Sequence, residues 1–401
     1  MRVGIYFPEY YPEAGGGYTF ELELFESIIS SASESKHTFI LFMNKSFANS
    51  LSTKIHFDSK ITIVFLPKST LVRRVIGEIK LVLNKNNKFR YKFKNELQSI
   101  AHQKGVHMIW FPTPVYEPVE IPYIATAWDI QHRVHPWFPE VGVDRDWNPR
   151  ELFFSNLLRR ATYIISPNQA GMRELSFFYQ IPEERIKLLP HPTPRFAIEI
   201  EKTDSGNILN KYHIPRNYIF YPAQFWPHKN HVNLLYALKI LHDKYKIRLP
   251  LVFAGTDKGN KDYIQRMVRE LGLQEEVFFL GYVPTEDLIS LYQNALALTY
   301  VTYFGPGSIP PLEAFVLGCP VIASNVSGAD EQLGDCAILV DPRRPDEIAN
   351  AIKSLWDNPE LRQELIAKGF ARKVWTGHDY LRGVFDILDE FETVRNAWPA
   401  N

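Results

Sequence analysis

Cysteine is scarce in this chain: Cys319 and Cys336 are its only two among 401 residues. Two cysteines are too few for a disulfide framework, and neither belongs to a paired-cysteine zinc motif. No stretch approaches the roughly 18 apolar residues of a membrane-spanning helix, and the N-terminus lacks the long apolar segment of a secretory signal. We therefore expect a soluble protein of a reducing, cytoplasmic compartment.

Net charge is also absent, because 45 basic and 45 acidic residues cancel. This balance argues against a dedicated nucleic-acid-binding protein. The charge is nevertheless uneven, since residues 68–94 carry nine basic side chains and one acid, Glu78. The segment alternates apolar and basic positions at helical spacing, which favours a peripheral contact with anionic lipid headgroups or a phosphorylated acceptor. A solvated helix face followed by a charged loop is the alternative.

Short apolar runs rich in β-branched and aromatic residues alternate with helical patterns in both halves of the chain. Such runs are typical of strands buried on both faces of a parallel sheet. The pattern is interrupted over 190–216, where prolines, charges and a turn signal occur together. We predict an α/β protein with two doubly wound, Rossmann-like domains facing each other across a cleft, followed by C-terminal helices. The predicted units are 1–195, a linker over 196–216, 217–375, and a helix over 376–401 that returns to the first domain.

The first candidate site is Gly15-Gly16-Gly17, between the first strand and the first helix. Bare backbone at a helix N-terminus suits a phosphate, and a flexible tight turn is the alternative. The dinucleotide pattern G-x-G-x-x-G would need glycine at position 20, which is Phe20. A nicotinamide-dependent enzyme is therefore disfavoured.

The second half offers two further candidates. Lys229 follows a strand and precedes a helix, where a cation suits a diphosphate. In the loop over 303–321, Gly305 and Gly307 leave the backbone bare, and Ser308 and Ile309 are expected to present N–H groups. Glu313 is expected in the first helical turn, facing the cleft, where it would accept the hydroxyls of a ribose.

Together these features resemble the retaining, GT-B-fold glycosyltransferases of family 4, also called glycosyl transferases group 1. The resemblance is strongest over 217–370 and is carried by Lys229, by FLGYV (279–283), whose Tyr282 lies in the turn that contacts the base, and by the block SIPPLEAFVLGCPVIAS (308–324). It implies metal-independent sugar transfer from a nucleotide sugar with retention at the anomeric carbon and no protein nucleophile. No cofactor is implied, and the donor is expected to be a GDP- or UDP-sugar. The residues that it assigns to donor binding are Gly16, Gly17, Gln224, Lys229, Tyr282, Gly307, Ser308, Ile309 and Glu313.

The sequence departs from the family pattern at three positions. The first glutamate of the family's Glu-x7-Glu motif is replaced by Gly305, and an arginine before the lysine by Gln224. The family's His-Asp pair appears as Trp128-Asp129. We expect Asp129 and Lys229 to be catalytic, with His132 taking the polar role of the missing histidine; a structural histidine is the alternative.

Two other features bear on the site. Trp226, beside Lys229, is expected to line the cleft. Asp144-Arg145-Asp146 matches a D-x-D metal motif, but it lies in a loop rich in Trp and Pro, so we expect no metal site there.

The sequence thus predicts a hexosyltransferase, with mannose among the candidate sugars, that acts on a polysaccharide, lipid-linked or other glycan acceptor. The expected location is the cytoplasm, including the inner face of the membrane. Two alternatives stay open: an inactive family-4-like protein that binds carbohydrate or nucleotide, and a GT-B sugar-nucleotide epimerase.

Overall fold

The computed structural model describes residues 1–8, 15–44, 58–66, 96–115, 117–142, 147–199, 206–305 and 307–398. The basic segment 68–94 and the Asp144-Arg145-Asp146 motif lie outside the described residues, so the predictions for both remain untested.

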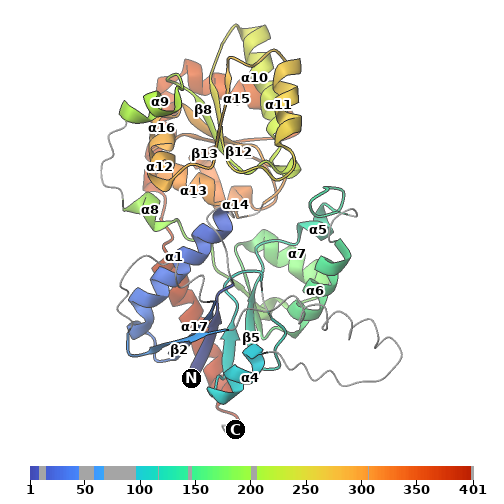
Figure 1. The fold of residues 1–401 in the computed structure, drawn as a ribbon, viewed down its shortest axis with the longest axis vertical. Coiled ribbons are helices and arrows are strands. Elements are labelled where there is room, and N and C mark those ends of the chain that lie inside the picture. The colour runs from blue at the N-terminus through green and yellow to red at the C-terminus, as the bar shows by residue number, and fades with distance from the viewer. Residues whose placement is uncertain are drawn as a thin grey trace.

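Two parallel β-sheets, each covered by helices, form the two domains (Figure 1). The seven strands of the first sheet lie in the order β3-β2-β1-β4-β5-β6-β7. They span Arg2–Tyr6 (β1), Thr38–Met43 (β2), Ile61–Phe65 (β3), Met108–Trp110 (β4), Tyr123–Thr126 (β5), Tyr163–Ser166 (β6) and Ile186–Leu188 (β7). The described helices of this half are Gly16–Ser31 (α1), Glu96–Gln103 (α4), Gln131–Val134 (α5), Trp147–Arg160 (α6) and Gln169–Tyr179 (α7).

The second sheet has the order β10-β9-β8-β11-β12-β13. Its strands span Ile219–Pro222 (β8), Leu251–Ala254 (β9), Val277–Gly281 (β10), Ala297–Tyr300 (β11), Val321–Ser324 (β12) and Ala337–Val340 (β13). The short helices Arg195–Ile198 (α8) and Gly206–Tyr212 (α9) precede it. Its remaining helices are His231–Tyr245 (α10), Lys261–Glu270 (α11), Thr285–Asn294 (α12), Ile309–Val316 (α13), Ala329–Leu333 (α14), Pro345–Asp357 (α15) and Pro359–Ala371 (α16).

Burial on both faces explains the uniformly apolar strands. In β2, Phe39 and Leu41 belong to one core cluster while Ile40 and Phe42 belong to another. Successive side chains of a strand point to opposite faces, so each sheet face needs its own apolar set. The predicted α/β class with two parallel, doubly wound sheets is confirmed.

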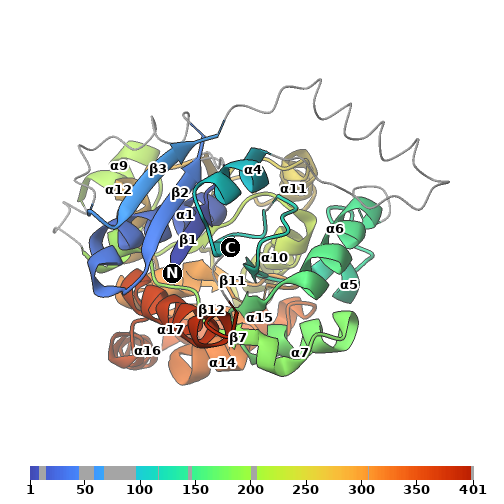
Figure 2. The same cartoon turned by 90° about the horizontal axis from the view of Figure 1, so that it is seen from below.

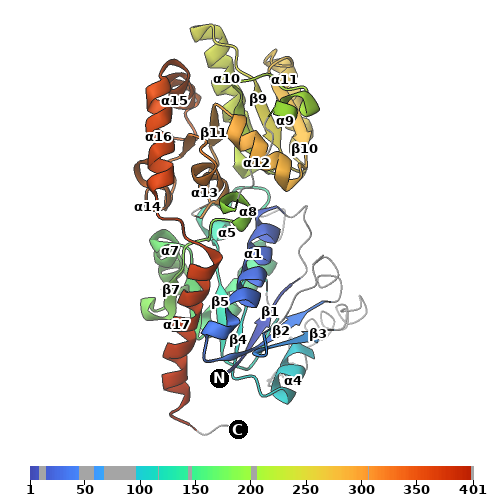
Figure 3. The same ribbon diagram turned by 90° about the vertical axis from the view of Figure 1, so that its left-hand side faces the viewer.

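The last helix, Gly377–Arg395 (α17), lies along the first domain beside α1 (Figures 1 and 3). It begins with a capping box formed by Thr376 and Asp379. Its buried residues join the core cluster that contains β1 and α1, and the N-terminal ammonium donates to Glu392 over 2.9 Å. The N-terminus and the end of α17 therefore meet at one end of the molecule (Figure 2).

The predicted domain boundaries stay predictions. The first sheet ends at Leu188 and the second begins at Ile219, with the region 190–216 between them. None of the described helices is long and apolar enough to cross a lipid bilayer.

Candidate active site

The glycine loop lies where the two domains approach each other. Gly15 has φ +68°, a conformation that favours glycine, and precedes the first residue of α1. A side-chain carbon placed on Gly15 would lie 3.6 Å from Gln224 Nε2, and one on Gly16 would lie 3.9 Å from Ile309 Cδ1. The structure therefore brings the first-domain loop together with two predicted donor-site residues of the second domain. The free N–H groups of the α1 N-terminus add a partial positive charge there.

Lys229 ends a single 3-10 turn, Pro227–Lys229, between β8 and α10. Its Nζ donates to the Tyr300 hydroxyl over 2.8 Å and lies 5.2 Å from the centre of that ring. The next residue, Asn230, has φ +57° and donates from Nδ2 to the carbonyls of Val301 and Pro342 over 2.9 and 2.7 Å. Within the described part of the chain, Lys229 forms no ion pair. The fold thus holds a cation with an uncompensated charge at the start of α10.

Gln224 lies just before this turn and is held by two side-chain hydrogen bonds. Its Nε2 donates to Thr256 Oγ1 over 3.2 Å, and its Oε1 accepts from Trp226 Nε1 over 3.0 Å. Trp226 is partly exposed, and Lys258 Nζ lies 5.9 Å from the centre of its ring. Two of the predicted residues, Gln224 and Trp226, therefore form one hydrogen-bonded unit beside Lys229.

Tyr282 follows β10 and is 55% exposed. The pKa of Tyr18, in the first turn of α1, is raised mainly by burial and to a smaller extent by the neighbouring Tyr282 phenol. Tyr282 thus lies near the glycine loop, with an exposed ring of the kind that stacks on a base.

One expectation about the loop before α13 needs correction. The Ser308 N–H is not free, because it donates to Gln332 Oε1 over 3.1 Å, and Gln332 Nε2 donates back to the Ser308 carbonyl over 2.8 Å. The side chain of Ile309 is buried in the first-domain core cluster and so joins the domains, while the expected role of its N–H stays a prediction. Gly305 has φ +129°, where a glutamate would be strained. Gly307 packs against His191, whose Cδ2 would lie 2.9 Å from a side-chain carbon at that position.

Glu313 is also placed differently from the prediction. It is the fifth residue of α13 rather than in the first turn, and it is 6% exposed. Its Oε2 accepts from the Tyr292 hydroxyl of α12 over 2.6 Å. Burial raises the pKa of Glu313 to about 7, against the smaller lowering effect of Tyr292. The carboxyl faces the interior of the domain, so its contact with a ribose stays a prediction.

The prediction that His132 takes a polar role in the cleft is contradicted. His132 is fully buried, and its Nε2 lies 3.0 Å from the Tyr179 hydroxyl and 3.2 Å from Glu151 Oε2. The ring also stacks on Phe154. Burial lowers the pKa of His132, which is the behaviour of a neutral, structural histidine. Only 131–134 is helical here, so Asp129 and His132 do not share a helix face.

Asp129 has a partner that the sequence does not reveal. The pKa of Glu174, on α7, is raised to about 7, mainly by burial and to a smaller extent by the nearby Asp129 carboxyl group. Asp129 Oδ1 also accepts from the backbone N–H of Gln131 over 3.0 Å. Glu174 was missed because nothing distinguishes it from an ordinary surface glutamate of an amphipathic helix. The result is a pair of neighbouring carboxyl groups, in which Glu174 has the raised pKa.

A second missed contact joins the domains directly. The carboxylate of Glu140 accepts from the backbone N–H of His228 over 2.9 Å and from the His228 ring. Burial lowers the pKa of His228 to about 4, so a neutral ring donates to an ionised carboxylate. Since His228 precedes Lys229, the first domain helps to hold the turn that presents this cation.

Comparison with known proteins identifies the second domain. Residues 206–372 match the model of the family described as glycosyl transferases group 1. The second domain belongs to the glycosyl transferases group 1 family. This group 1 domain contains Gln224, Lys229 and Glu313. The predicted family is therefore confirmed, and its match ends before α17.

Curated relatives and solved structures extend the comparison. The chain is 29% identical over 217 residues to O-antigen chain mannosyltransferase B of Escherichia coli, covering 54% of this chain and 57% of that protein. It is 26% identical to O-antigen chain mannosyltransferase RfbU of Salmonella typhimurium, covering 60% and 64%. The chain thus spans less than two thirds of the length of these relatives.

The solved structures show the fold. A glycosyltransferase from Rickettsia africae has a TM-score of 0.68 at 15% identity, covering 97% of this chain and 98% of that one. Anabaena HepE, solved with UDP and glucose, has a TM-score of 0.68 at 17% identity, covering 98% and 100%. The whole chain therefore has the GT-B fold.

Proposed function

We propose that this protein is a retaining, metal-independent glycosyltransferase that moves a hexose from a nucleotide sugar to a glycan or lipid-linked acceptor. Lys229 carries this proposal, because it is a fixed cation without an ion pair in the described residues. Gln224, just before the turn that ends at Lys229, lies against the glycine loop at the N-terminus of α1. A cation and a helix N-terminus at one place suit a diphosphate.

In the proposed step, an acceptor hydroxyl forms a new C–O bond at the anomeric carbon while the C–O bond to the diphosphate breaks. The hydroxyl proton passes to the departing diphosphate, on the same face of the sugar. Lys229 and the N–H groups at the start of α1 stabilise the negative charge that develops on the leaving group. The proposed site residues lie on both domains.

The names of the relatives support mannose as the transferred sugar, since two of them are O-antigen chain mannosyltransferases. The HepE structures contain UDP, so a GDP- or UDP-sugar is the proposed donor. We further propose a cytoplasmic location, including the inner face of the membrane.

The direct test is incubation of the purified protein with GDP- and UDP-sugars and candidate glycan acceptors, in buffer containing EDTA. We expect nucleoside diphosphate release that depends on acceptor, and NMR of the product should show the donor's anomeric configuration. Inversion at that carbon would contradict the retaining mechanism, and full loss of activity with EDTA would contradict metal independence.

The same assay separates the alternatives. Nucleotide binding without release from any donor, in the presence of every acceptor, would favour an inactive binding protein. Epimerised donor without transfer would favour an epimerase.

A further inference from the structure

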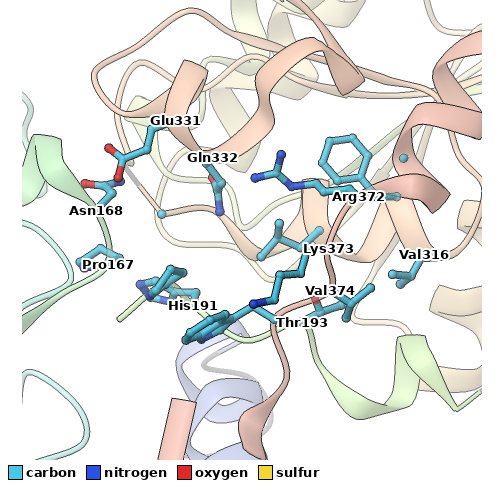
Figure 4. A pocket seen from close by; sticks show the side chains of 16 residues that line it. Pro167, Asn168, His191, Thr193, Val316, Glu331, Gln332, Arg372, Lys373 and Val374 are labelled. Atoms are coloured by element: carbon cyan, nitrogen blue, oxygen red, sulfur yellow. The ribbon is translucent and has the colours of Figure 1, made fainter. Parts of the chain in front are cut away.

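The chain crosses between the domains twice, first after β7 and again between α16 and α17. These two crossing segments, called the first and second passage, contact each other. The backbone N–H of Thr193, on the first passage, donates to the carbonyl of Trp375, on the second, over 2.7 Å. Beside this contact lies a cavity of about 110 Å³, far above the roughly 10–15 Å³ that holds one water. It is lined by both passages, by the segment before α7, and by residues of α13, α14 and α16 (Figure 4).

Two cations of the second passage line this hinge cavity. The Arg372 side chain points toward Gln332, and Lys373 extends toward His191 (Figure 4). Neither cation forms an ion pair among the described residues, although Lys373 Nζ lies 5.2 Å from the centre of the Trp375 indole. The lining also includes Glu331, but both its carboxylate oxygens accept from the backbone N–H of Gln169 over 3.0 Å. The hinge cavity therefore has an excess of positive charge.

We propose that the hinge cavity binds a phosphate-class oxyanion, held by Arg372 and Lys373. Guanidinium and ammonium groups form their strongest hydrogen bonds with such anions. An oxyanion there balances the excess positive charge of the lining. Because the lining includes His191 of the first domain and Arg372, which follows the second, the bound anion also lies between the domains.

Gly307, one of the predicted donor-binding residues, lines the hinge cavity, but Lys229, Gln224 and Gly15, on which the proposed donor site rests, do not. The proposal does not depend on sugar transfer, so phosphate binding can be tested whether or not the protein has activity.

The test is titration with inorganic phosphate by calorimetry, with ionic strength held constant by sodium chloride. Arg372→Ala should weaken phosphate binding about 10- to 100-fold, because a charge-assisted hydrogen bond is lost. Lys373→Ala should have a smaller effect, since Lys373 is more exposed.

The control is Arg216→Ala. Arg216 is an exposed arginine outside the hinge cavity, and this variant should bind phosphate as the wild type does. The proposal is overturned if the wild type binds no phosphate up to about 10 mM, a very weak affinity. It is also overturned if Lys229→Ala abolishes binding while Arg372→Ala and Lys373→Ala do not.

Discussion

The two sides of the proposed donor site differ in how their polar groups are held. On the second-domain side, Lys229 is fixed by a hydrogen bond to Tyr300, and Gln224 by hydrogen bonds with Thr256 and Trp226. On the first-domain side, the described part of the glycine loop offers backbone and a helix N-terminus, while His132 faces the interior. In the proposed site, the charge for a diphosphate therefore comes mainly from the second domain, and the first domain contributes shape and backbone dipoles.

The largest effect should follow from removal of Lys229. Lys229→Ala should lower turnover on the order of 10²–10³-fold, as expected when one electrostatic contact to a leaving group is lost. Lys239→Ala is the matched control, because Lys239 lies on α10 and, among the described residues, pairs with Asp243 on the surface. Steady-state rates with the best donor decide the matter, and equal activity of the two variants would place the diphosphate elsewhere.

A substitution in the glycine loop should have the next largest effect. Gly15→Val forces a branched side chain into a left-handed conformation, at about 1–2 kcal/mol, and places it against Gln224. Nucleotide binding should weaken about 10-fold or more. Gly259→Val, also at positive φ but with no atom within 4 Å of the new carbon, controls for the backbone strain. If both variants bind nucleotide equally, the loop does not meet the donor.

Glu313 makes a prediction about pH. Burial raises its pKa in the folded state to about 7, from an ordinary value of 4.5. Between these values the folded state binds more protons than the unfolded state, so stability falls as pH rises from 4.5 to 7 and then levels off. Glu313→Gln should remove part of this slope, measured by denaturant unfolding across that range. An unchanged slope would mean that Glu313 is ionised in the fold.

The smallest effect on activity should come from His132. His132→Phe leaves Glu151 and Tyr179 without one partner, and should destabilise the fold by about 1–3 kcal/mol. Turnover of the folded variant should stay within about threefold of wild type, whereas Asp129→Asn should lower it further. A large loss of kcat in a stably folded His132→Phe protein would restore the catalytic prediction.

The same two sides show what sequence can reveal. The alternation of apolar strands and helices predicts both sheets, because each strand is buried on both faces. Lys229 and Gly15 can be detected from the sequence because each lies just before a helix, which is a local pattern. The partners of Ser308, Glu313 and His132 are not detectable, because Gln332, Tyr292 and Tyr179 reach them only through packing of distant segments.

The decisive experiment is the structure of the protein with a bound nucleoside diphosphate. We expect the terminal phosphate beside Lys229 Nζ and the N-terminus of α1, with the base near Tyr282. A diphosphate bound away from Lys229, such as in the hinge cavity at Arg372, would contradict it.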